Sequence, residues 1–89
     1  MKFFFIELYD PEAGPLQFYF NEKHSPAHRQ YDICVVDTQG VTYHFTMQKS
    51  NKGWKIVHPP KLPKWIVSFE GQLSNAILEH VANVHEARQ

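Results

Sequence analysis

The apolar residues of this chain recur with two different periods, and the change falls near Pro63. Before that point apolar and polar residues alternate in short runs, as they do on β-strands with one buried face. After it the apolar residues recur at spacings of three and four, as on one stripe of a helix. The stripe consists of Ile66, Phe69, Leu73, Ile77, Val81 and Val84. The two periods together predict an α+β fold in which a C-terminal helix covers one face of a sheet.

Proline, glycine and polar clusters divide the first part of the chain into strands. The predicted fold is a five-stranded antiparallel β-meander with strands at about 3–9, 15–22, 31–37, 41–48 and 53–58, followed by a helix at about 63–86. We expect this helix to be continuous, with Gly71 as the place for a kink. Because residues 65–69 are rich in β-formers, a short sixth strand there is an alternative. The strand order across the connection at 22–30 is left open.

The first predicted hairpin turns at residues 10–14, which we interpret as a five-residue loop. This loop places Leu8 opposite Leu16, so that one face of the hairpin is wholly apolar. The opposite face then pairs Phe5 with Tyr19. We therefore expect aromatic side chains on both faces of the sheet.

The second predicted hairpin turns at residues 38–40, where glycine at the third position suits a type I turn followed by a left-handed residue. This loop places Ile33 opposite Phe45 and directs Val41 toward the core. The fifth strand is expected to end at His58-Pro59-Pro60, since proline cannot donate a hydrogen bond to a neighbouring strand. Residues 86–89 are expected to fray.

The length and composition favour one small folded domain spanning residues 1–89. Hydrophobic residues make up 43% of the chain, which is typical of a protein that folds unaided. The only cysteine, Cys34, excludes an intrachain disulfide, so we expect a reducing compartment and a cytoplasmic protein. Glu7 interrupts the apolar start of the chain before it reaches the length of a signal peptide. No window approaches the roughly 20 apolar residues that cross a bilayer, so no membrane partner is expected.

The sheet face that the helix does not cover is the first candidate site, because it is more aromatic than a solvated face needs to be. Its candidate binding residues are Phe3, Phe5, Tyr19, Val36 and His44. An ordinary solvated face with scattered apolar groups is one interpretation. The other is a contact surface, most simply a homodimer. The leading hypothesis is a small non-catalytic interaction protein that self-associates through this face.

A basic segment is the second candidate site. Its lysines are Lys49, Lys52, Lys55, Lys61 and Lys64, and residues 38–69 contain no acidic residue. If the five ammonium groups form one patch near His58, they offer a surface for nucleic-acid phosphate, and single-stranded nucleic-acid binding is the alternative function. The formal net charge of zero argues against it. Lysine in turns and on an edge strand also serves solubility and prevents strand pairing.

A third candidate is a catalytic site at Cys34 and His44, which the predicted register places opposite each other with Asp32 one step along the diagonal. A thiol beside an imidazole and a carboxylate has the groups that an activated nucleophile requires. A flat sheet lacks the concave, water-excluding site that such chemistry also needs, so the enzyme hypothesis is the weakest of the three.

No metal or cofactor is expected. The six histidines have no convincing ligand spacing, and His80 and His85 are five residues apart rather than the four that aligns ligands on a helix. Phosphate-loop, dinucleotide-binding and G-x-S-x-G patterns are absent from the sequence.

Overall fold

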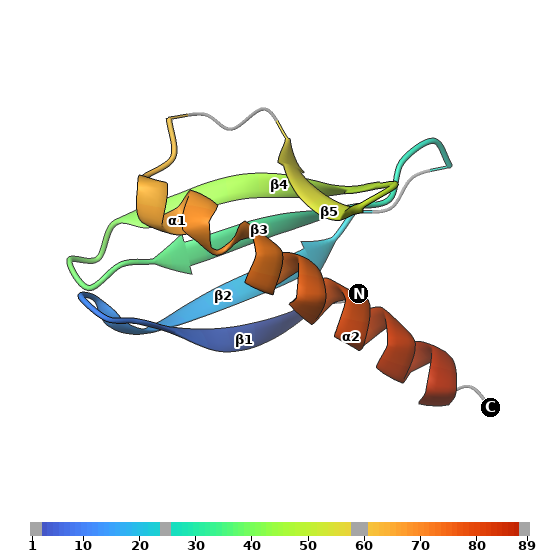
Figure 1. Ribbon diagram of the computed structural model, residues 1–89, viewed down its shortest axis with the longest axis horizontal. Coiled ribbons are helices and arrows are strands. Elements are labelled where there is room, and N and C mark those ends of the chain that lie inside the picture. Colours follow the sequence, from blue (N-terminus) through green and yellow to red (C-terminus); the bar gives the residue numbers. More distant parts are fainter. Residues whose placement is uncertain (1–2, 24–25, 58–60, 88–89) are drawn as a thin grey trace.

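The computed structural model describes residues 3–23, 26–57 and 61–87, with side chains as far as residue 82. Its elements are β1 (Phe3–Asp10), β2 (Gly14–Glu22), β3 (Gln30–Val36), β4 (Thr42–Ser50), β5 (Gly53–Val57), α1 (Lys64–Ser68) and α2 (Glu70–Ala87). The strands form one antiparallel sheet in the order β1-β2-β3-β4-β5, which settles the order across the 22–30 connection. The helices lie on one face of this sheet (Figure 1). The predicted α+β meander with a helical cover is therefore confirmed.

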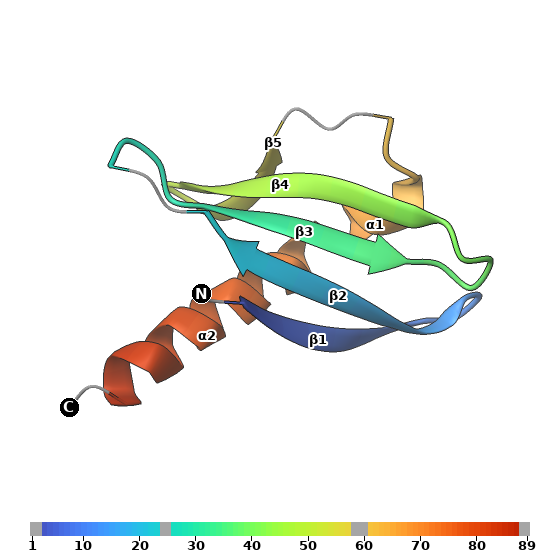
Figure 2. The ribbon, with the colours of Figure 1, turned by 180° about the vertical axis from the view of Figure 1, so that it is seen from behind.

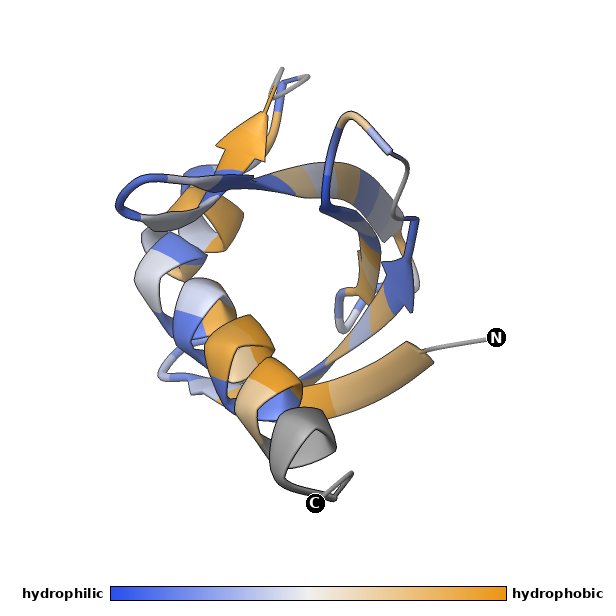
Figure 3. Ribbon diagram, turned by 90° about the vertical axis from the view of Figure 1, so that its right-hand side faces the viewer, coloured by the Kyte–Doolittle hydropathy of each residue, from blue (hydrophilic) through white to orange (hydrophobic). Residues whose placement is uncertain are grey.

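The sheet is strongly curled, and a view along its end shows the helices closing the open side of the curl around the core (Figure 3). The apolar rows that alternate along the strands and the helical stripe meet inside this curl. The buried apolar residues are Leu16, Phe18, Phe20, Tyr31, Ile33, Val35, Phe45, Met47, Trp54, Ile66, Phe69, Leu73 and Ile77.

The first hairpin is tighter than predicted. β1 continues to Asp10 and β2 begins at Gly14, and these two residues pair with each other. The loop therefore has three residues rather than five. The Asp10 carboxylate accepts the backbone N–H groups of Glu12 at 3.0 Å and Ala13 at 2.8 Å. These bonds close the turn, and the predicted pairing of Leu8 with Leu16 is confirmed.

The second hairpin has the predicted three-residue loop, with Gly40 at a φ of 83°. Asp37 stabilises it by accepting the N–H groups of Gln39 and Val41, each at 2.9 Å. The predicted pairing of Ile33 with Phe45 is confirmed. The inward placement of Val41 is wrong: it precedes β4, which begins at Thr42, and its side chain is 45% exposed because the turn holds it away from the core.

The predicted single helix is two helices that meet at Phe69. The break falls at Phe69 rather than at Gly71, which lies inside α2, and no sixth strand forms at 65–69, because residues 65–68 belong to α1. The aromatic ring of Phe69 packs edge-on against Phe18, with centroids 5.7 Å apart. The break lets this ring enter the core, while Ile66 is buried from the preceding turn.

Helix α2 also closes the β5 edge of the sheet. At this edge, the backbone N–H of Trp54 donates to Ser74 Oγ and that of Ile56 donates to Glu70 Oε2, each at 3.0 Å. Side chains one helical turn apart thus replace the missing neighbouring strand. The predicted end of this strand at His58-Pro59-Pro60 lies outside the described residues, as do the burial of Val84 and the state of the last two residues.

Tyr31 shows how strongly the core excludes water. Its ring packs against Trp54 with centroids 5.2 Å apart, and its side chain is almost fully buried. Burial raises the pKa of Tyr31 to about 12, and the Glu22 carboxylate directly opposite adds to the rise while Arg29 opposes it. The phenol is therefore neutral throughout the physiological range.

Candidate interaction surface on the outer sheet face

The outer face is the sheet face that points away from α1 and α2, and a view from behind shows neither helix lying over it (Figure 2). Three of its aromatic side chains are substantially exposed: Phe3 by 58%, Phe5 by 56% and Tyr19 by 39%. The rings of Phe5 and Tyr19 are in contact, with centroids 5.8 Å apart. Val36 is also exposed, at the far end of β3. The predicted outward direction of these side chains is what the structure shows.

Strand pairing arranges the outer-face residues in rows that cross the sheet. One row runs from β1 to β5 through Phe3, Asn21, Asp32, Thr46 and Val57. The adjacent row contains Phe5, Tyr19, Cys34 and His44. Each row begins with a phenylalanine on β1 and carries polar side chains on β4, Thr46 in the first row and His44 in the second.

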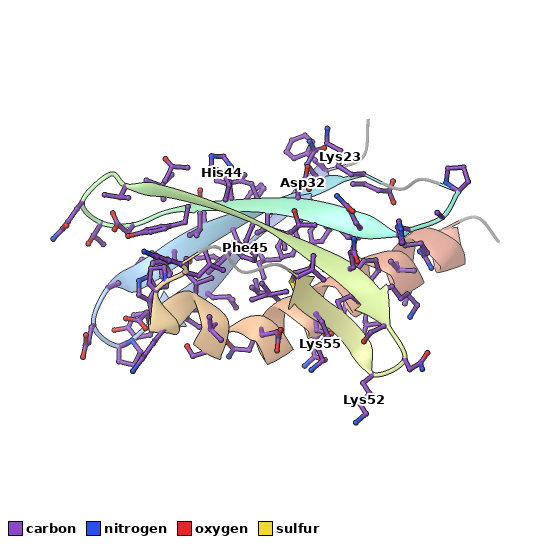
Figure 4. All side chains as sticks on the ribbon, turned by 90° about the horizontal axis from the view of Figure 1, so that it is seen from above. Lys23, Asp32, His44, Phe45, Lys52 and Lys55 are labelled. Atoms are coloured by element: carbon purple, nitrogen blue, oxygen red, sulfur yellow. The ribbon has the colours of Figure 1, made fainter. Side chains whose placement is uncertain are left out.

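All residues of these two rows except Phe5 line a shallow, open hollow of about 800 Å³. We call it the outer hollow; its lining residues are Phe3, Tyr19, Phe20, Asn21, Lys23, Asp32, Ile33, Cys34, His44, Phe45, Thr46 and Val57. Lys23, Asp32 and His44 lie on the side of the sheet opposite the helices, as Figure 4 shows. The predicted residues Phe3, Tyr19 and His44 are thus brought together in one place, while Phe5 flanks the hollow and Val36 lies apart from it.

A ladder of polar side chains crosses β3 and β4 beside the hollow. The Asp32 carboxylate accepts hydrogen bonds at Oδ1 from Thr46 Oγ1 at 3.1 Å and from Gln30 Nε2 at 3.4 Å. Gln30 Oε1 in turn accepts from Gln48 Nε2 at 3.2 Å. Within the part of the chain that the structure describes, the donors that hold Asp32 in place are both neutral.

Cys34 and His44 are directly opposite each other, as the predicted register requires. No hydrogen bond joins them among the described residues, and Asp32 is engaged by Thr46 and Gln30 rather than by the imidazole. The three residues therefore share a surface without forming a relay that would activate the thiol. The described part of the chain also holds no cluster of three or more potential metal ligands.

The five lysines of the basic segment are divided between different parts of the molecule. Lys49 and Lys52 lie at the β4–β5 turn, whereas Lys61 and Lys64 lie at the α1 end on the opposite side of Figure 1. Lys55 lies on the edge strand β5, where its Nζ is 3.8 Å from Oε1 of Glu70 on α2 (Figure 4). The structure does not bring these ammonium groups into one patch on the outer face.

Asn21, Lys23, Thr46 and Val57 were not predicted as site residues, although each lines the outer hollow. A usable signal existed for Lys23: it follows Tyr19 and Asn21 at the same period of two that places their side chains outward. Its N–H donates to Gln30 O at 2.9 Å, so the β2–β3 ladder continues past Glu22 and keeps that direction.

Fold and surface together define a small α+β protein with a curled antiparallel sheet, one face closed by helices and the other open and aromatic. In the comparisons, no family model, no curated protein and no solved structure matches the chain. Among the described residues, neither helix has both the length and the apolar character needed to cross a bilayer.

Proposed function

We propose that this protein is a small non-catalytic interaction module that self-associates through its outer face. The observation that carries the proposal is the exposure of Phe3, Phe5 and Tyr19 together on a sheet face that neither helix covers. Scattered exposed apolar residues are normal, but a contiguous aromatic group on one face is typical of a contact surface. A second copy covers such a face with chemistry of the same kind.

The size of the face sets the strength of the expected association. Strands ~4.8 Å apart and about seven residues long, at ~3.3 Å per residue, span roughly 24 by 23 Å across five strands. That area is below the ~800 Å² per partner of a standard stable interface. The curl of the sheet reduces it further. We therefore expect a reversible rather than a permanent dimer.

The structure supports catalysis and nucleic-acid binding less well than it supports self-association. No hydrogen bond links Cys34 to His44 in the described part of the chain, and the lysines are spread over both ends of the molecule. Formal net charge is zero, which argues against single-stranded nucleic-acid binding, because such binders draw much of their affinity from phosphate neutralisation. A lone thiol that forms no intrachain disulfide fits a reducing, cytoplasmic setting for the module.

Sedimentation velocity over a range of protein concentrations tests the proposal. We expect the sedimentation coefficient to rise with concentration, and we expect Phe5→Asp to abolish the rise because it places a charge within the contact. Leu78→Asp is the matched control, since Leu78 is an exposed apolar residue on α2, away from the outer face. It should leave association unchanged. A wild-type protein that stays monomeric at the highest concentration contradicts the proposed function.

A further inference from the structure

The outer hollow contains one cationic and one anionic side chain, on neighbouring strands. Lys23 directly follows β2, and Asp32 lies on β3. Lys23 pairs through its backbone with Gln30, two residues before Asp32, so the two charged residues are diagonal neighbours on the same face. Figure 4 shows both on the side of the sheet that faces away from the helices.

Neither charge has an ionic partner among the residues that the structure describes. The Lys23 ammonium forms no ion pair there, with Asp32 or with any other described carboxylate. Among the described residues, Asp32 receives hydrogen bonds from the neutral groups of Thr46 and Gln30 alone, both on Oδ1.

We propose that a second copy of this chain packs on the outer hollow about a two-fold axis, with Lys23 of each copy forming an ion pair with the partner's Asp32. The inference rests on the proposed self-association and adds the pair of residues that sets its register. A two-fold axis between the two side chains creates both ion pairs at once, because an isologous contact repeats every interaction.

Charge complementarity favours a second copy over other partners. Any partner must offer an anion and a cation at the spacing of Lys23 and Asp32, and a second copy meets this requirement by symmetry. The formal net charge of zero adds no repulsion between copies. Phe3 and Val57, at the two ends of the transverse row, supply apolar contact around the charged centre.

A charge-swap experiment tests the pairing directly. Lys23→Glu and Asp32→Lys each place like charges against each other in a homodimer. The dimer dissociation constant of each variant alone should therefore be at least about tenfold above that of the wild type. In an equimolar mixture the two variants restore both ion pairs between unlike copies. The mixture should therefore sediment as a dimer with a dissociation constant within about threefold of the wild type.

A parallel set of variants protects the test against misfolding, since Asp32 is half-buried and hydrogen-bonded. Asp32→Asn keeps the shape of the side chain, and Lys23→Gln removes the opposite charge. Each should weaken the dimer several-fold, and the double variant should be no weaker than either single one, because both changes remove the same interaction. Lys52→Glu, on an exposed lysine at the β4–β5 turn, is the control and should change nothing.

The outcomes separate the two proposals. A wild-type protein that never dimerises contradicts the proposed function and this pairing with it. A wild-type dimer whose charge-swapped mixture associates no better than the single variants leaves self-association standing but overturns the Lys23 pairing with the partner's Asp32. Additive losses in the double variant would overturn the pairing too, because two residues that act through one ion pair cannot lose it twice.

Discussion

At Gly53 both the backbone conformation and a neighbouring side chain require a residue without a Cβ. Its φ is 115°, a conformation that residues with a Cβ rarely adopt. A Cβ there would lie 2.9 Å from Ser74 Oγ, the atom that accepts the N–H of Trp54. Gly53→Ala should therefore lower the free energy of unfolding by about 1 to 3 kcal/mol through backbone strain and a disturbed hydrogen bond. Urea unfolding with an unchanged slope measures the loss.

Gly71 provides a control in which the same substitution should change the free energy of unfolding in the opposite direction. It lies in α2, is exposed, and a Cβ there would meet nothing within 4 Å. Gly71→Ala should raise the free energy of unfolding by about 0.5 to 1 kcal/mol, since alanine loses less backbone entropy in a helix. If both variants moved the urea midpoint in the same direction, the local conformations assigned to these two glycines would be wrong.

Among the elements, the contact between β5 and α2 is made by side chains that imitate a neighbouring strand. Glu70 serves it twice, because Oε2 accepts the N–H of Ile56 while Oε1 lies 3.8 Å from Lys55 Nζ. The ammonium is about half exposed, so solvent screens the ion pair and little stability comes from it. The hydrogen bond to the edge of the sheet is the stronger contribution.

This difference predicts how Glu70 variants rank. Glu70→Ala leaves the N–H of Ile56 unpaired and should cost about 1 to 3 kcal/mol. Glu70→Gln keeps an oxygen that accepts this bond and loses only the ion pair and the favourable charge at the helix N-terminus, so it should cost less than about 1 kcal/mol. Chemical denaturation ranks the two, with Lys55→Gln as the control for the ion pair. Equal losses in both Glu70 variants would show that the charge, not the bond, matters.

Hairpins were predictable at the level of elements because their turns are specified locally. Gly40 supplies the left-handed residue of the second loop, and the register followed from it. The tightness of the first loop depends on two bonds to the Asp10 carboxylate, which spacing alone does not reveal. The helix break at Phe69 was missed for a different reason. It depends on where the Phe18 ring lies, a contact between residues about fifty positions apart in the chain.

For the whole molecule, the sequence predicted the two faces but not the shape of the outer one. Period-two alternation separates inward from outward side chains without any knowledge of curvature. The outer hollow arises from the twist and curl of the sheet, which depend on packing around the entire core. Lys23 therefore looked like a loop residue, although it lines the hollow beside Asp32.

The separation of the two faces predicts that stability and association respond to different phenylalanines. Phe18 is fully buried and Phe5 is 56% exposed, although the two lie on neighbouring strands. Phe18→Ala should lower the free energy of unfolding by about 3 to 5 kcal/mol because it leaves a cavity in the core. Phe5→Ala removes a contact with Tyr19 on an exposed face and should cost no more than about 1 kcal/mol when measured on dilute, monomeric protein. In sedimentation, however, Phe5→Ala should weaken association. A Phe5→Ala variant as unstable as Phe18→Ala would show that the outer face belongs to the folding core rather than to an interface.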